Sequence, residues 1–139
     1  MKIGVINYGY EKLPLRVHYN DAGADVFALD EIILPAHSAV KIPLGFGLRI
    51  PDGYMFCNYP KSGMASKGII SNIPPIDSGY TGEIHAILTN ISKDNYIIEK
   101  GDKVAQLVMT PVLLPEFIPE ENMENKDARG TGGFGSTGK

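Results

Sequence analysis

The stretch VKIPLGFGLRI, from Val40 to Ile50, carries the clearest structural pattern in this chain. Every second residue in it is apolar, and the residues between are charged, glycine or proline. Side chains alternate between the two faces of a β-strand, so this period of two predicts one strand with a single buried face. The glycines Gly45 and Gly47 would let that strand bend or bulge.

Similar short segments lie on both sides of this stretch and predict further strands. They are Lys2–Asn7, Asp25–Leu29, Glu31–Leu34, Tyr54–Tyr59, Glu83–Asn90, Tyr96–Glu99 and Lys103–Leu113. Turn-forming residues separate them at short intervals, as in NDAG, PDG, IPP and KGD. Only SGMASK, Ser62–Lys67, favours a short helical turn. Many short strands with very little helix predict an all-β sandwich or barrel.

Composition narrows the class of protein. Apolar residues make up 43% of the 139 residues, which suits one globular domain with a core of its own. The formal net charge of −3 argues against a dedicated nucleic-acid binder, which would carry a basic excess. No segment approaches the roughly 20 apolar residues that span a bilayer. The single cysteine, Cys57, fits a reducing compartment, so we expect a cytoplasmic protein without nucleic-acid or membrane partners.

Two loops carry residues that can do chemistry, and each also has a plain structural interpretation. Lys61, Ser62 and Gly63 follow a predicted strand, where a cation, a hydroxyl and backbone amides can cradle phosphate. The same residues also suit a solvated turn with a capping serine. Asp77 begins a tight turn that leads to Tyr80, so its carboxylate can orient a water as a general base or simply cap its own turn.

Two polar residues within predicted strands raise the same choice. Asp25 begins a strand although aspartate is disfavoured there, which indicates a task such as holding backbone amides or a hydrated metal. That task can be structural or catalytic. Gln106 lies between apolar neighbours, where it need only mark the wetter face of its strand.

The chain changes character after residue 114. The segment PEFIPEENMENKD, residues 115–127, is acidic and broken by proline, which is typical of a solvated linker. The last segment, RGTGGFGSTGK, is rich in glycine and cannot bury enough surface to order itself alone. It is either a dispensable tail or a flap that orders on a ligand. We therefore divide the chain into a β-barrel region, residues 1–114, and a linker with a glycine-rich flap of the same domain, residues 115–139.

In order along the chain, five segments resemble the five motifs of the trimeric dUTP pyrophosphatase (dUTPase) family. They are AGADVFA, KSGMASKGI, IDSGYTGEI, GDKVAQL and RGTGGFGSTG. The resemblance runs from about Asp21 to Lys139. It implies a jelly-roll-like (β-clip) distorted barrel and a homotrimer whose three active sites lie between chains. It also implies hydrolysis of dUTP to dUMP and pyrophosphate with Mg2+, which the family holds mainly through the substrate phosphates and waters.

The resemblance further implies a role for each motif residue. Asp77 falls at the general base, and Tyr80 at the aromatic residue that packs under the deoxyribose. The hairpin formed by Asn72–Ile76 with Ile84 and His85 falls at the uracil-reading position. The phosphate-binding positions are Lys61, Ser62, Gly63, Arg129, Ser136 and Thr137. Gln106 falls at the polar position of the fourth motif, and Gly135 is a further substrate-binding position. Phe134 would stack on uracil, and Asp25 would touch the water shell of the metal.

The chain departs from the family pattern in two places. Lys61 stands where the family usually has arginine, which keeps the charge but loses the bidentate fork. The segment between Gly68 and Asp77 is short and carries Ile73, Pro74 and Pro75 where glycines are common.

Two other functions compete with dUTP hydrolysis. A dCTP deaminase of the same fold would need a catalytic glutamate where this chain has Ile87, which argues against deamination. The alternative from another class is a nucleotide-gated regulatory or binding protein on the same fold.

Overall fold

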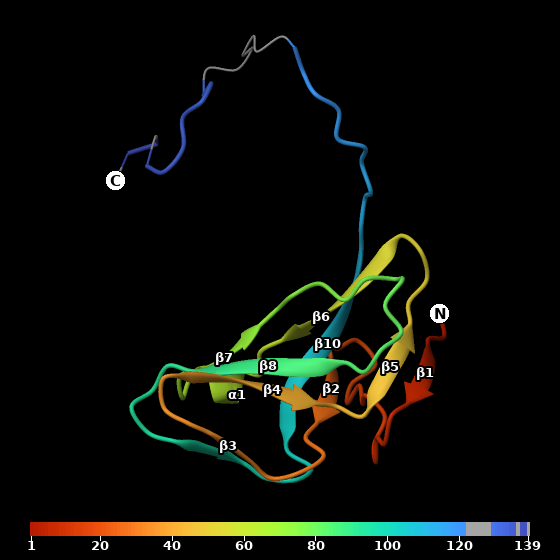
Figure 1. The fold of residues 1–139 in the computed structure, drawn as a ribbon, viewed down its shortest axis with the longest axis vertical. Coiled ribbons are helices and arrows are strands. Elements are labelled where there is room, and N and C mark those ends of the chain that lie inside the picture. Colours follow the sequence, from red (N-terminus) through yellow and green to blue (C-terminus); the bar gives the residue numbers. More distant parts are fainter. Residues whose placement is uncertain (122–128, 136, 139) are drawn as a thin grey trace.

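Apart from one short helical turn, the regular secondary structure of the described residues consists of short strands, which confirms the all-β prediction (Figure 1). The computed structural model describes residues 1–121, 129–135 and 137–138. Within them the elements are β1 (Gly4–Asn7), β2 (Ala24–Phe27), β3 (Ile32–Leu34), β4 (Ser38–Pro43), β5 (Phe46–Arg49), β6 (Tyr54–Tyr59), α1 (Ser62–Ala65), β7 (Ile69–Asn72), β8 (His85–Asn90), β9 (Tyr96–Ile98) and β10 (Lys103–Pro111). The helix α1 is a single turn within the predicted SGMASK segment.

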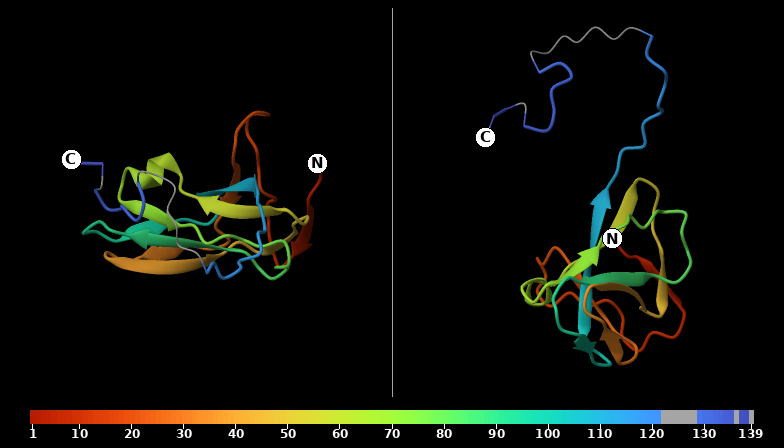
Figure 2. Two further views of the ribbon diagram at one scale, coloured as in Figure 1. Left: turned by 90° about the horizontal axis from the view of Figure 1, so that it is seen from above. Right: turned by 60° about the vertical axis from the view of Figure 1, so that its left-hand side comes forward.

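The described strands form four antiparallel sheets with the orders β1-β5, β2-β10-β6, β3-β9 and β4-β8-β7. Strands far apart in the sequence are neighbours, as β2 and β10 are, which is typical of a jelly-roll-like barrel rather than a simple meander. Figure 2 shows from two directions how the sheets wrap around one interior. Buried residues from all four sheets fill that interior, among them Val26, Leu34, Ile42, Phe46, Leu88, Ile98 and Val104.

The apolar residues of Val40–Ile50 are buried from Ile42 onward as predicted, but Gly45 and Gly47 between them are buried as well, and the prediction of one continuous strand is wrong. The apolar residues from Ile42 to Ile50 are at most 5% exposed. The chain breaks between β4 and β5 at Gly45, which has a φ of +75°. The carbonyl of Gly45 accepts hydrogen bonds from the backbone N–H groups of Tyr8 and Tyr10, at 2.8 and 2.9 Å. A Cβ at Gly45 would lie 2.7 Å from the Tyr10 nitrogen, so only glycine allows this corner.

One strand was not predicted. Strand β7 pairs with β8 from Ile69 opposite Asn90 to Asn72 opposite Ile87. Its sequence, IISN, ends in two polar residues and therefore shows too little alternation to stand out. It extends the sheet that carries His85 and ends where the loop to Asp77 begins.

The C-terminal segment leaves the barrel after β10 (Figures 1 and 2). The N–H of Val112 still donates to the carbonyl of Gly53, at 2.9 Å. Beyond it the apolar side chains lie open, with Leu113 94% and Phe117 92% exposed. The assignment of residues 115–139 as a flap of the same domain stays a prediction. No helix in the described part of the chain is long and apolar enough to cross a membrane.

Candidate active site

Asp77 is held at the start of a turn directly after a strand bridge. The backbones of Phe56 and Ile76 exchange two hydrogen bonds, of 3.1 and 2.7 Å, which tie the loop to β6. The N–H of Tyr80 then donates to the carbonyl of Asp77 at 3.0 Å and closes the turn. The Asp77 side chain is exposed, so its carboxylate can meet water or a ligand.

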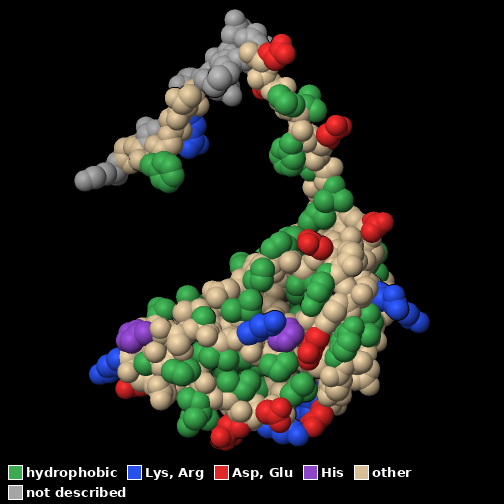
Figure 3. Space-filling view, in the orientation of Figure 1, with side chains coloured by type: hydrophobic (Ala, Val, Ile, Leu, Met, Phe, Trp, Pro, Cys, Tyr) green, Lys and Arg blue, Asp and Glu red, His purple; other side chains and the backbone are tan. Residues whose placement is uncertain are grey.

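A cleft of about 280 Å³ contains this turn. Its lining residues are Lys41, Pro74, Pro75, Ile76, Asp77, Tyr80, Glu83, Ile84 and His85. The structure therefore brings together Asp77, Tyr80 and His85, which the sequence assigned to base, sugar and uracil. It adds Lys41 and Glu83, which no local sequence pattern marks as site residues. Figure 3 shows basic, acidic and histidine side chains beside one another near the middle of this face.

The ring of Tyr80 forms a fixed wall of the cleft. Its hydroxyl donates to the carbonyl of Glu83 at 2.8 Å. Gly82 lies against the ring so closely that a Cβ there would be 2.7 Å from the Tyr80 hydroxyl oxygen. The carbonyl of Thr81 accepts a hydrogen bond of 3.0 Å from the Tyr8 hydroxyl, which anchors the same loop to the N-terminal segment. A flat aromatic surface held in this way suits packing against a sugar or a base.

His85 and Asn72 differ in their relation to this cleft. The Nδ1 atom of His85 lies 3.1 Å from the carbonyl oxygen of Glu83, at the cleft wall. The carbonyl of His85 accepts a hydrogen bond of 3.1 Å from the side-chain amide of the buried Asn58, which fixes the start of β8. Asn72 is not among the lining residues, and its side-chain amide donates to the Thr89 hydroxyl at 3.2 Å. In the single chain Asn72 therefore braces the β7–β8 pair.

A second cleft, of about 470 Å³, gathers residues of three other motifs. Its lining residues are Leu15, Val17, His18, Asp21, Ala22, Gly23, Asp25, Lys61, Lys103 and Gln106. Gln106 donates from its amide to the Pro60 carbonyl at 3.0 Å. Gly23 packs directly against the Gln106 side chain, where no Cβ would fit. Asp25, Lys61 and Gln106 were predicted, whereas Lys103 was missed although it lies in the quoted GDKVAQL segment.

Asp25 is the electrostatic centre of the second cleft. It is 7% exposed and forms ion pairs with Lys61 and with Lys103, whose ammonium lies 2.8 Å from Asp25 Oδ2. Burial by itself raises the pKa of the Asp25 carboxyl. The hydrogen bonds and charges of the two lysines outweigh burial, so its pKa lies below the ordinary value. Asp25 is therefore an ionised carboxylate that keeps two ammonium groups at the cleft.

Ser62 and Gly63 lie beside this cleft at the start of α1. Lys61 precedes the turn in an extended conformation, with φ −86° and ψ 132°. Within the turn the side chain of Met64 is buried against the core. Ser62 and Gly63 are exposed. The helix is too short to act as a dipole, but the hydroxyl and local amides can donate to an anion next to Lys61.

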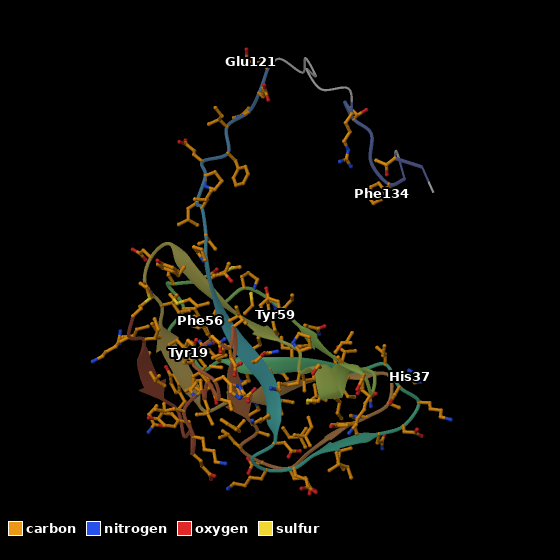
Figure 4. The ribbon with its side chains drawn as sticks, turned by 180° about the vertical axis from the view of Figure 1, so that it is seen from behind. Tyr19, His37, Phe56, Tyr59, Glu121 and Phe134 are labelled. Carbon is orange, nitrogen blue, oxygen red and sulfur yellow. The ribbon has the colours of Figure 1, made fainter. Side chains whose placement is uncertain are left out.

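The predicted tail residues lie apart from both clefts. Arg129 donates from Nε to the Gly132 carbonyl at 3.0 Å within the tail itself. Phe134 has a φ of +40° and is fully exposed, and Figure 4 shows it well away from Phe56 and Tyr59 on β6. Gly135 and Thr137 are also exposed, and Ser136 lies outside the described residues. In one chain the predicted site is thus divided among two clefts and a tail.

An all-β barrel with an exposed carboxylate in one cleft and two lysines in another has the groups that a nucleotide hydrolase of jelly-roll fold needs. The chain belongs to the dUTPase family, whose model matches residues 10–138. The deoxyuridine 5′-triphosphate nucleotidohydrolase of Clostridium tetani is 43% identical over 131 residues, covering 92% of this chain and 90% of that protein. The family hydrolyses dUTP to dUMP and pyrophosphate, and a trimer is typical of it.

Two solved phage structures extend the comparison. The dUTPase of Staphylococcus bacteriophage 80alpha with dUPNHPP has a TM-score of 0.86 and 27% identity, with 99% of each chain covered. Phage dUTPases such as that of 80alpha control transfer of virulence genes by a proto-oncogenic G protein-like mechanism. A mutant dUTPase from phage phi11 of S. aureus, in which a structural Mg(II) ion is coordinated, has a TM-score of 0.82 and 26% identity. The superposition covers 90% of this chain and 100% of the phi11 chain.

Proposed function

We propose that this chain hydrolyses dUTP with Asp77 as the general base. Asp77 accepts a proton from a water molecule, and the water oxygen forms a bond to the α-phosphorus. The bond from that phosphorus to the oxygen bridging to the β-phosphate breaks, and its electron pair leaves with pyrophosphate. The product is dUMP. The observation that carries this proposal is the cleft that joins Asp77, Tyr80 and His85.

The nucleoside would bind in that same cleft. The Tyr80 ring, held by its bond to the Glu83 carbonyl, would pack under the deoxyribose and leave no room for a ribose 2′-hydroxyl. Backbone groups of the Pro74–Ile76 loop and of Ile84–His85 would pair with the edge of uracil. Asn72, whose side-chain amide donates to the Thr89 hydroxyl, would add a contact through its second N–H or its amide oxygen.

The phosphates would bind to residues of the second cleft and of the tail. Lys61 supplies charge, while Ser62, Gly63 and Gln106 supply directed donors. From the tail, Arg129 would bind the terminal phosphate, Phe134 would stack on uracil, and Gly135, Ser136 and Thr137 would donate to the phosphates. Negative charge develops on phosphate oxygens as pyrophosphate leaves, so positioned cations and donors account for much of the catalysis in such sites.

Magnesium fits this arrangement as a companion of the substrate. Among the described residues, no three His, Cys, Asp or Glu side chains are grouped so that they could hold a metal ion. Mg2+ would be held chiefly by the triphosphate and waters, and Asp25 would reach its water shell once the phosphates have drawn Lys61 and Lys103 away from the carboxylate. Bound there, the ion would neutralise charge on the phosphate oxygens.

We further propose that three chains assemble and share their sites. The division of the predicted residues between two clefts and an outlying tail supports sharing, since a tail that leaves the barrel can reach a neighbour. The partners are then dUTP and two further copies of this chain, and the expected location is the cytoplasm.

Parallel assays test the proposal. Pyrophosphate release is measured from dUTP, dCTP, dTTP and UTP at equal concentration, with and without Mg2+. Release from dUTP alone, lost on removal of Mg2+, is the expected result. Equal release from UTP, or ammonia release from dCTP, would contradict it.

Nucleotide-gated regulation is a second candidate, favoured by the G protein-like mechanism described for the similar phage protein. It requires the tail to report bound nucleotide. Limited proteolysis of the tail, with dUpNHpp or with dUMP, tests this requirement. Protection by dUpNHpp alone would support gating, and identical cleavage in both samples would eliminate it.

A further inference from the structure

Lys103 reaches the second cleft because β10 is irregular. The register of β10 on β2 is Lys103–Phe27, Ala105–Val26, Gln106–Asp25 and Leu107–Ala24, with a shift between Lys103 and Ala105. In a regular strand, residues three apart point to opposite faces, so Lys103 would point away from the Gln106 side. The extra residue, Val104, reverses this and directs Lys103 to the face of Asp25 and Gln106.

The bulge brings a second ammonium group to a carboxylate that already has one. Lys61 binds Asp25 Oδ1, and Lys103 Nζ lies 2.8 Å from Asp25 Oδ2. One ammonium group suffices to neutralise one carboxylate, so the cluster keeps an excess of positive charge. The lysine side chains are 27% and 45% exposed, whereas the Asp25 side chain is 9% exposed. The carboxylate is thus enclosed while both cations face the cleft.

The other charged groups at this cleft leave that excess in place. The Asp21 carboxylate accepts a hydrogen bond of 2.9 Å from the backbone N–H of His18. The Nδ1 atom of the His18 ring lies 3.1 Å from the same carboxylate oxygen. Arg16 lies close by and donates to the Asp21 carbonyl. A cleft with basic groups on both sides of one enclosed carboxylate suits a ligand with several negative charges, such as a chain of phosphates.

We propose that Lys103 is a second phosphate-binding lysine, and that Asp25 holds Lys61 and Lys103 in the cleft until the phosphates of the substrate form ion pairs with them. The inference rests on the proposed function and assigns to Lys103 the phosphates beyond the α-phosphate. Lys103 then offsets the loss of the arginine fork at position 61, because two point charges replace one bidentate group.

The test compares binding of dUpNHpp with binding of dUMP, which lacks the outer phosphates. In Lys103→Met, affinity for dUpNHpp should fall about tenfold, as expected for one charged contact on a partly exposed side chain. Affinity for dUMP should stay within about twofold of wild type. Lys103→Arg should keep most of the dUpNHpp affinity. The matched control is Lys100→Met, which removes the same charge from a nearby exposed lysine paired with Glu11.

Several outcomes would overturn the inference. If Lys103→Met weakens the binding of dUMP and of dUpNHpp equally and lowers the melting temperature, Lys103 is only a structural partner of Asp25. If Lys100→Met has the same effect on dUpNHpp, general charge and not this site is responsible. Should Lys103→Met not fold, Lys103→Gln keeps a donor to Asp25 without the charge, and unchanged dUpNHpp binding by it refutes the role. Wild-type protein that releases no pyrophosphate from dUTP would instead refute the proposed function.

Discussion

Two inactive variants should restore activity when they form mixed trimers. One variant is Asp77→Asn, which keeps the tail but lacks the base. The other ends after residue 121, so it keeps Asp77 but lacks Arg129 and Phe134. The chain leaves the barrel after Val112 (Figure 1), and no described tail residue lines the Asp77 cleft; Figure 4 shows Phe134 well away from Phe56 and Tyr59. If each site takes its base and its tail from different chains, a mixed trimer can contain complete sites.

The expected recovery follows from random assembly. At equal mixing, a site has an intact Asp77 with a chance of one half and an intact tail with an independent chance of one half. Turnover should therefore reach about one quarter of the wild-type value per site. As the mixing ratio is varied, turnover should follow the product of the two fractions, with its maximum at equal amounts.

The assay is subunit exchange under mild denaturation, followed by pyrophosphate release from dUTP. Native mass spectrometry confirms the mixed trimers, and chains mixed without exchange are the control. If base and tail come from the same chain, neither variant ever supplies both, so no mixture regains activity. Confirmed mixed trimers without recovery would therefore refute shared sites.

Three further predictions concern single residues. Asp77→Asn should keep the fold and dUpNHpp binding while turnover falls by about three orders of magnitude or more, because an amide cannot take a proton from water; a variant with a tenth of wild-type turnover would exclude Asp77 as the base. Tyr80→Ala should lower the preference for dUTP over UTP, and Gly82→Ala should do the same because its methyl group would displace the Tyr80 ring; an unchanged ratio of kcat/KM values in both would remove this ring from sugar selection. The ion pairs of Asp25 lower its pKa, so they stabilise the fold fully above about pH 4 and are lost as pH falls through the lower folded-state value. The difference in unfolding free energy between wild type and Asp25→Asn should therefore shrink in acid, and a difference independent of pH would contradict this.

The sequence by itself determined the class of fold and most of the candidate residues. Alternation at Ile42, Phe46 and Leu48 predicts a buried face because strand periodicity is a local property. The Asp77 turn could likewise be predicted, since turn chemistry depends on adjacent residues. The order of the five motifs then pointed to the family, and with it to residues in the tail that no local pattern would assign to a site.

Only the tertiary structure decided which of these residues meet. The break at Gly45 depends on the N-terminal segment, whose Tyr8 and Tyr10 bind its carbonyl from more than thirty positions away in the sequence. Lys41 reaches the Asp77 cleft because β4 pairs with β8, and Lys103 reaches Asp25 because of a bulge in β10. Register and bulges depend on the pairing of distant strands, which local patterns do not encode.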